Sequence, residues 1–368
     1  MLVALTSAFW SASQAFGKGV RFGYDKNNQV ISAEYWGRPG SLESLALSSY
    51  PNLVSLDITY YTTLNQSDLD QIAKITSLEE LTFGQDAILG ETVAVDGDPS
   101  VLRSLKRLEW MKVSVAEFDQ SDWGFLNVLP RLEYLEVDVG LDFDAKSCTL
   151  TDDFGKTLGE IQSLRELSLW GAEDLTDAFI SNVADRNKRC ESLMFGDGEF
   201  TDAALARISR DFPELIWLEI GGNRISDRGV EHLSRLPKLE MLTIYSGSLS
   251  TVSVRSAAKI PTLTKLELGV VAVDVADIRL LSKLPKLERV IFRQLALSDE
   301  SLSCFTGHPT LVSLFCDGSQ LDLVKTIQVV QSLPNVDYLS VGPASSPIQQ
   351  AVSREVKRIE QLRKAGDR

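Results

Sequence analysis

The residue types on which most enzymes and metal sites depend are scarce in this chain and are not grouped in its sequence. Only two histidines occur. His308 stands three residues before Leu311, where neighbouring segments carry leucine or isoleucine, so we interpret it as a core residue. His232 adjoins Leu233 on an expected helix and should face solvent. Because neither has a nucleophile motif nearby, the sequence predicts a protein that is not an enzyme and uses no cofactor.

The cysteines and the acidic clusters do not make a metal site in sequence. The four cysteines lie far apart, and no pair has the CxxC spacing of a zinc site. Cys190 and Cys316 fall at apolar positions of the pattern described below, whereas Cys148 is expected to be exposed. The stretches 96–98 and 138–144 offer acidic oxygens that suit Ca²⁺, but they lack the EF-hand spacing. We interpret them as solvated loops and leave calcium binding by them open.

The charge of the chain limits the classes of partner. Its formal net charge is −14 and its pI is about 4.8. Such a chain repels phosphate backbones, so the sequence predicts no nucleic acid partner and favours a protein or peptide ligand. No stretch is apolar over the length that a transmembrane helix needs, so no transmembrane segment is predicted.

Residues 1–19 form an apolar start with no charge before Lys18. The run Leu2–Trp10 and the small residues near Ser13–Ala15 resemble part of a signal peptide, but the positive segment that should precede them is missing. If residues 1–15 are a signal-peptide remnant, the protein is exported or associated with the cell envelope. Otherwise it is cytoplasmic, and the sequence leaves both alternatives open.

A short apolar pattern recurs along most of the chain. The stretch LPKLE occurs at Leu236–Glu240 and returns at Leu284–Glu288, 48 residues later. Around its second leucine, the pattern apolar-x-x-apolar-x-apolar recurs at intervals of 24 to 32 residues, mostly 24 or 25. The first apolar residue of each copy, which we call the anchor, stands at Leu53, Leu78, Leu108, Leu132, Leu164, Cys190, Leu215, Leu239, Leu263, Leu287, Leu311 and Val336.

Other residue types keep fixed distances from the anchor. Proline lies two residues before it in eight copies, where it ends a helix and favours an extended chain. Eleven residues after the anchor stand residues that are good helix N-caps. They are Thr201, Ser226, Ser250, Asp274, Ser298 and Asp322. Each copy is therefore predicted to be a short strand, a turn, a capped helix and a proline corner.

The copies resemble leucine-rich repeats of the helix-backed, ribonuclease-inhibitor-like type, as in many bacterial repeat proteins, over residues 30–341. The resemblance implies an α/β fold, namely a right-handed solenoid curved into a horseshoe. A parallel β-sheet then forms the concave face, and mainly α-helices form the convex face. The family often has asparagine eight residues after the anchor, where its side chain ties neighbouring coils together. Only Asn223 fits that column here, so we do not expect an asparagine ladder.

The pattern predicts four segments. Residues 1–19 are the apolar start, residues 20–52 are an N-terminal β-hairpin cap and first coil, and residues 53–341 are about 12 repeats. Residues 342–368 are a linker and a C-terminal amphipathic helix. This helix is interpreted as a cap over the last coil or, alternatively, as a helix that binds a partner or self-associates. Its apolar stripe is Ile348, Val352, Val356, Ile359 and Leu362.

Strand alternation predicts which side chains line the concave face. Because the apolar residues of each copy face inward, the intervening positions face outward from the sheet. They combine aromatic residues and methionines with an acidic flank and a basic patch, which is typical of binding hot spots, although the rings could also serve only to stack along the sheet. The predicted partner-binding residues are Trp110, Tyr134, Glu136, Asp138, Glu166, Trp170, Met194, Trp217, Met241, Tyr245, Lys265, Arg289 and Arg293.

The sequence therefore predicts a non-enzymatic scaffold that recognises a protein or peptide through its concave face. The alternative is an adaptor or substrate-receptor subunit that recruits a second protein through the C-terminal helix. Recognition of carbohydrate by the aromatic residues is a weaker variant of the first hypothesis.

Overall fold

The computed structural model divides the chain into two compact units, Met1–Ala172 and Glu173–Arg368, which we call the N-terminal and C-terminal units. The structure describes residues 20–36, 42–58, 63–84, 93–115, 119–139, 150–171, 173–270, 272–317 and 321–366. The apolar start and Cys148 lie outside the described residues.

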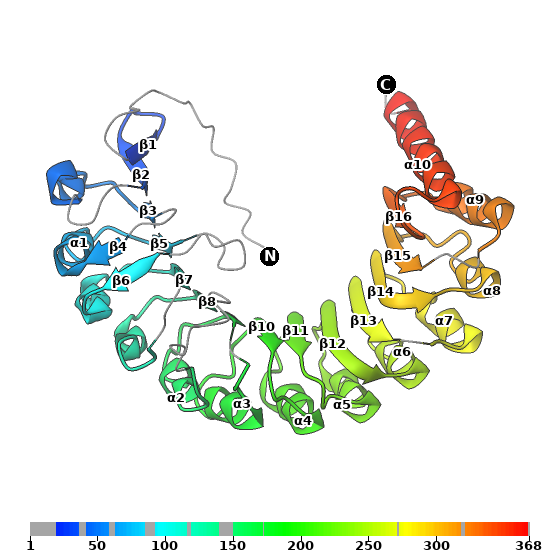
Figure 1. The fold of residues 1–368 in the computed structure, drawn as a ribbon, viewed down its shortest axis with the longest axis horizontal. Coiled ribbons are helices and arrows are strands. Elements are labelled where there is room, and N and C mark those ends of the chain that lie inside the picture. Colours follow the sequence, from blue (N-terminus) through cyan, green and yellow to red (C-terminus); the bar gives the residue numbers. More distant parts are fainter. Residues whose placement is uncertain are drawn as a thin grey trace. The chain divides into compact units, whose positions relative to one another are not determined.

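The N-terminal unit is built on a mostly parallel sheet (Figure 1). Strands β1 (Val20–Tyr24) and β2 (Val30–Tyr35) form an antiparallel hairpin. Then β2 pairs in parallel with β3 (Ser55–Ile58), and the parallel series continues through β5 (Glu80–Phe83), β7 (Trp110–Val115), β8 (Tyr134–Val139) and β9 (Glu166–Trp170). Two short strands, β4 (Thr63–Asn65) and β6 (Ala94–Asp96), pair separately.

The helical side of the N-terminal unit consists of short pieces. The α-helices are α1 (Gln66–Ile72) and α2 (Phe154–Gly159). The 3₁₀ turns are η1 (Leu42–Leu45), η2 (Leu47–Ser49), η3 (Pro99–Ser104) and η4 (Gly124–Val128). This geometry suits connections that make only one or two turns before returning to the sheet.

The C-terminal unit repeats strand and helix more regularly. Its strands β10 (Ser192–Asp197), β11 (Trp217–Gly221), β12 (Met241–Leu249), β13 (Lys265–Val270), β14 (Arg289–Ala296), β15 (Ser313–Asp317) and β16 (Tyr338–Ser340) pair in chain order, and all pairs are parallel. The helices are α3 (Asp177–Ala184), α4 (Asp202–Asp211), α5 (Asp227–His232), η5 (Leu233–Arg235), α6 (Thr251–Ala257), α7 (Val275–Leu281), α8 (Asp299–Ser303), α9 (Leu323–Ser332) and α10 (Pro347–Gly366).

Burial of the leucine columns fixes the register of these parallel strands. Leu218 pairs with Leu242, and Leu242 pairs with Leu266, so each coil repeats the position of the one before it. All three side chains have no exposed surface, and the anchors Leu239 and Leu263 are equally buried. The predicted period and the inward direction of its apolar residues are therefore confirmed.

Neighbouring coils of the C-terminal unit are tied together by aspartates at the first turn of each helix. The Oδ1 of Asp202 accepts from the backbone N–H of Ser226 at 2.7 Å, and its Oδ2 accepts from the Ser226 hydroxyl at 2.6 Å. Thr201 makes the same two bonds to Asp177, and Ser250 makes them to Asp227. This serine/threonine–aspartate ladder connects neighbouring coils three to four residues beyond the column in which the family often has asparagine.

The same hydroxyls also cap their own helices. The predicted N-caps accept a backbone N–H at Thr201, Ser226, Ser250, Ser298 and Asp322, but the prediction is wrong at Asp274. The Asp274 side chain makes no cap bond, and its backbone N–H donates to the Thr251 hydroxyl of the preceding coil at 3.0 Å.

Helix α10 covers the last strand of the C-terminal unit. The Gln349 side chain accepts from the backbone N–H of Val341 at 2.7 Å and donates to the carbonyl of Leu339 at 3.0 Å, so it satisfies groups beside β16. Val352 and Val356 lie on the buried side of this helix, whereas Leu362, near its end, is 61% exposed. Only part of the predicted apolar stripe is therefore in the core.

We predict that Asp202→Ala lowers the free energy of unfolding by about 2 kcal/mol, because it removes two hydrogen bonds to a carboxylate. The measurement is the urea unfolding midpoint. The matched control is Asp174→Ala, which changes an exposed aspartate in the turn before α3 and should shift the free energy by less than about 0.5 kcal/mol. An equal loss in both variants contradicts the inter-coil role of Asp202.

A second prediction concerns acid stability. Burial alone would raise the pKa of Asp227, but hydrogen bonds from Ser250 and Ser253 outweigh it, and the pKa is lowered. A carboxylate whose folded pKa is depressed stabilises the fold above its unfolded pKa of about 3.9, and this stabilisation is lost as the pH falls through the folded value. Asp227→Asn should therefore flatten the fall in urea midpoint below about pH 4. An unchanged pH profile would contradict this assignment.

Candidate functional site

Each sheet has one side covered by helices and one side that no described helix covers, which we call the open face (Figure 1). It is the face that the sequence predicts to be concave. Side chains of adjacent strands stand side by side on it in rows, because neighbouring strands pair without offset over most of their length. All thirteen predicted partner-binding residues belong to strands whose register places them on this face.

In the N-terminal unit, Trp110 and Tyr134 form a stacked pair. Their ring centroids are 4.7 Å apart, and the ring planes differ by 10°. The Tyr134 hydroxyl donates to Glu136, whose other carboxylate oxygen lies 2.8 Å from the Lys112 Nζ. Burial and the neighbouring Glu136 raise the pKa of the Tyr134 phenol, so it stays a hydrogen-bond donor at neutral pH. The pair is therefore held in one orientation on the open face.

The other predicted residues of this unit differ in accessibility. The Trp170 indole N–H donates to the Ser168 hydroxyl at 2.7 Å, and its ring is half-buried. Glu166 is also half-buried, directly beside Tyr134. Asp138, however, is only 6% exposed and lies between Ser114 and Trp170 in the strand pairing. Asp138 therefore contributes little accessible surface to this face.

In the C-terminal unit, the predicted aromatic and basic residues are connected through two buried glutamates. Tyr245 donates its hydroxyl to Glu219 at 2.9 Å. The Arg293 guanidinium lies 5.1 Å from the Tyr245 ring centroid and donates to Glu267 at 2.6 Å. The Lys265 Nζ lies 3.8 Å from a Glu267 oxygen and 6.0 Å from the Trp217 ring centroid. These contacts form one network across β11 to β14.

This network places two residues of the predicted basic patch, Lys265 and Arg293, beside a buried carboxylate. Glu267 is 4% exposed and Glu219 is 9% exposed, so both charges are largely withdrawn from solvent. The hydrogen bond to Glu267 raises the pKa of Arg293, although burial opposes it. Lys265 and Arg293 thus share one buried counter-ion, Glu267, while the Arg293 side chain stays 55% exposed. Arg289 is exposed and makes no ion pair with any described residue.

Sequence reasoning did not single out Glu219 and Glu267 as part of the site. Their signal was weak, because a glutamate on a strand usually faces solvent. What identifies them is the partner on the next strands, since Tyr245 follows Glu219 by 26 residues and Arg293 follows Glu267 by 26 residues. In both pairs the 26 residues correspond to one repeat of 24 residues plus two residues, and two residues separate neighbouring side chains on the same face of a strand.

Two further open-face residues were outside the predicted set. Phe315 is 40% exposed and Tyr338 is 53% exposed, on the neighbouring strands β15 and β16. Half-buried Ile291 pairs with Phe315 across the strands, and Arg289 pairs with Ser313. Phe315 and Tyr338 thus add exposed apolar surface to the C-terminal unit's open face, where Met194 and Met241 are half-buried.

Several polar atoms on the open face are buried without a hydrogen-bond partner in the described part of the chain. In the C-terminal unit they are the hydroxyls of Ser192 and Thr243 and the indole N–H of Trp217, on three consecutive strands. In the N-terminal unit the Ser114 hydroxyl is in the same state. Buried polar groups are rarely unsatisfied in folded proteins, so these atoms mark places where the face differs from an ordinary sheet.

The residue types singled out from the sequence for metal binding and catalysis are placed as follows. Within the described ranges, no three His, Cys, Asp or Glu side chains are placed to hold a metal ion. His308 is buried and accepts from the Leu311 backbone N–H at 3.2 Å, so the interpretation as a core residue is confirmed. Burial raises the pKa of the Cys190 thiol to about 12, while His232 is half-buried. No helix in the described ranges is long and apolar enough to cross a membrane.

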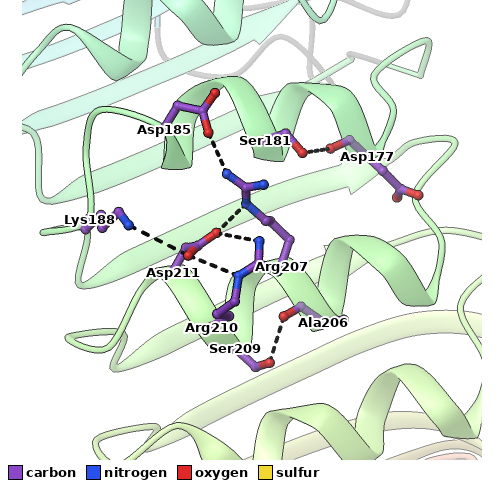
Figure 2. Close-up of polar contacts among 9 residues, drawn as sticks. All are labelled: Asp177, Ser181, Asp185, Lys188, Ala206, Arg207, Ser209, Arg210 and Asp211. Atoms are coloured by element: carbon purple, nitrogen blue, oxygen red, sulfur yellow. Dashed lines mark hydrogen bonds and ion pairs between the residues drawn. The ribbon is translucent and has the colours of Figure 1, made fainter.

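The largest ion-pair cluster in the described helices lies on the helical side of the C-terminal unit. Figure 2 shows the buried Asp211 facing Arg207, Arg210 and Lys188, with Arg207 reaching Asp185 at 2.5 Å. The hydrogen bond from Arg210 lowers the pKa of Asp211 against the opposing effect of burial. Because the contacts join α4 to the end of α3, we assign the cluster to the packing of neighbouring coils.

Comparisons with known proteins identify the fold. No protein-family model matches the sequence, and no curated protein matches it either. An internalin of Listeria monocytogenes is similar in structure, with a TM-score of 0.55 and 18% identity over 82% of this chain and 88% of that chain. The yeast Rad7 and Elc1 complex gives a TM-score of 0.49 and 15% identity, with coverages of 82% and 75%. The PEPR1–AtPEP1 structure gives 0.41 and 15%, with coverages of 87% and 49%.

The internalin match and the parallel coils agree on one fold. The chain is an α/β leucine-rich-repeat solenoid, so the predicted fold class is confirmed. Because the sequence identity to the internalin is 18%, this similarity supports the fold alone.

We predict that Thr243→Val raises the free energy of unfolding by about 1 kcal/mol, because it removes a buried hydroxyl that has no partner. Thr326→Val is the matched control. Thr326 is equally buried, but its hydroxyl donates to the Asp322 carbonyl at 2.8 Å, so its loss should lower the free energy by about 1 kcal/mol. The urea midpoint measures both. Destabilisation by Thr243→Val would mean that the hydroxyl is satisfied in solution.

Proposed function

We propose that this protein is a non-enzymatic scaffold that binds a protein or peptide partner through its open face. The single observation that carries the proposal is the stacked Trp110–Tyr134 pair. Both rings are half-buried and stand on a side of the sheet that no described helix covers. A ring whose orientation is already fixed loses little conformational entropy when a partner covers it, so it suits a binding hot spot.

The exposed apolar side chains of the C-terminal unit support the same function. Phe315 and Tyr338 keep 40% and 53% of their surface accessible, and Arg289 lies on the same face. Covering such rings removes apolar area from water, which favours association by about 25 cal/mol per Å². The network around Glu267 keeps Lys265 and Arg293 in place beside them.

The alternative role, recruitment of a second protein through α10, receives less support. The buried residues of this helix already cover the C-terminal unit, and Gln349 satisfies the backbone beside β16. Removal of residues 347–368 would therefore also uncover the core. Leu362→Asp changes only the exposed end of the helix and tests recruitment without that effect.

The test of the proposed function is capture of a partner from native lysate, identification by mass spectrometry and measurement of its Kd. We predict that Trp110→Ala weakens binding at least about tenfold, the usual effect of removing a hot-spot ring. The control is Val324→Ala, which trims a 63% exposed side chain on α9. The proposal fails if Val324→Ala weakens binding as much or if Trp110→Ala unfolds the chain. Loss of binding only in Leu362→Asp would favour the adaptor.

A further inference from the structure

The open face of the N-terminal unit is strongly acidic, in contrast to that of the C-terminal unit. Among the described residues, two cations, Arg21 and Lys112, share it with six carboxylates, and these eight side chains carry a formal net charge of −4. The six are Glu34, Asp57, Glu80, Glu136, Asp138 and Glu166. On the C-terminal unit's open face, the described charged side chains are the buried Glu219 and Glu267 and the cations Lys265, Arg289 and Arg293. Among the described residues, the excess negative charge therefore belongs to the N-terminal unit.

The acidic residues surround the aromatic pair in a regular row. Glu80, Trp110, Tyr134 and Glu166 occupy equivalent positions on the four neighbouring strands β5, β7, β8 and β9. A carboxylate thus stands on either side of the two stacked rings. Glu80 is exposed and forms no ion pair with any described residue, while Glu136 lies directly below Tyr134 in the next row.

An independent observation points to a polar ligand on the same face. The Ser114 side chain has no exposed surface, and its hydroxyl has no hydrogen-bond partner. It lies opposite Asp138 and two residues along β7 from Lys112. Since an unsatisfied buried hydroxyl is rare, this atom marks a polar position beneath the acidic face whose hydrogen bond is not made within the described residues.

We propose that this face binds a basic, extended protein segment whose cationic side chains alternate along the chain. The proposal rests on the proposed function and specifies the chemistry of the partner. Adjacent strands are about 4.8 Å apart, so Glu80 and Glu166 stand on strands about 14 Å apart. An extended segment that crosses the strands advances about 3.3 Å per residue, so residues four apart span about 13 Å.

The geometry gives each cation of such a segment a distinct place. The outer two cations reach Glu80 and Glu166, and the middle one lies over the Trp110–Tyr134 pair. A cation near the face of an aromatic ring is attracted by its quadrupole, most strongly for tryptophan. Arginine fits best, because its planar guanidinium both stacks on rings and binds a carboxylate with two hydrogen bonds. The proposed segment therefore carries arginine at alternate positions.

The experiment measures fluorescence anisotropy of three labelled ten-residue peptides with the full-length chain. Serine alternates with arginine in the first peptide, with glutamate in the second and with leucine in the third. The arginine peptide should bind, and its affinity should fall as the salt concentration rises from about 50 to 300 mM. Glu80→Gln with Glu166→Gln should weaken it about fivefold, because two ion pairs with the segment are lost.

Two controls separate site binding from general attraction to an acidic protein. Glu231→Gln removes an exposed carboxylate on α5 and should leave the affinity unchanged. Glu80→Gln alone changes an exposed side chain without an ion pair, so it keeps the fold while removing one contact of the segment. Thermal unfolding followed by circular dichroism confirms that each variant is folded.

The outcomes distinguish this inference from the proposed function. Equal loss in the double variant and Glu231→Gln overturns the inference, as does the absence of binding by the arginine peptide. Tighter binding of the leucine or glutamate peptide that still depends on Trp110 also overturns it, but leaves the binding function intact. Lysate capture that fails in every variant and in the wild type removes the proposed function itself.

Discussion

Burial of one leucine column against the next is the interaction on which the rest of this structure depends. It sets the parallel register of the strands, because a slip by one residue would turn every leucine toward solvent. The same register decides which side chains stand together on the open face. Trp110 meets Tyr134, and Glu219 meets Thr243, because their coils are aligned by the buried pairs one position away in each strand. The serine/threonine–aspartate ladder then fixes the other end of each coil in the C-terminal unit.

The open faces of the two units differ in how their charged side chains are paired. In the C-terminal unit, the buried Glu267 holds Lys265 and Arg293 in place, and the Arg293 guanidinium lies beside the Tyr245 ring. In the N-terminal unit, Arg21 and Lys112 face six carboxylates, and the aromatic pair is the large uncharged feature of its row among the described residues. Charge repulsion within that face is a cost to folding, which a cationic partner would relieve.

The sequence predicted the repeated part of this structure well and its contacts less well. Period, strand alternation and most helix caps depend on local residue types, and these were readable from Leu239, Leu263 and Ser226. The basic patch remains a prediction, and the sequence alone does not show that Glu267 reaches Arg293 on the next coil. The aspartate ladder was visible as Thr201-Asp202 and Ser226-Asp227, about one period apart, but only the structure shows that the second residue binds the next coil. Asp274 stands at the N-cap position of α7, but its side chain makes no cap hydrogen bond, and the structure gives no reason for this.

The central claim is that alternate strand side chains divide between the core and the open face, and methionine oxidation by dilute hydrogen peroxide tests it most directly. Met111 occupies a leucine column and has no exposed surface, whereas Met194 and Met241 are half-buried on the open face. Peptide mass spectrometry should find Met194 and Met241 oxidised in the folded protein, and Met111 oxidised only after unfolding. Oxidation of Met111 in the folded chain at the rate of the other two would contradict the register and every argument built on it.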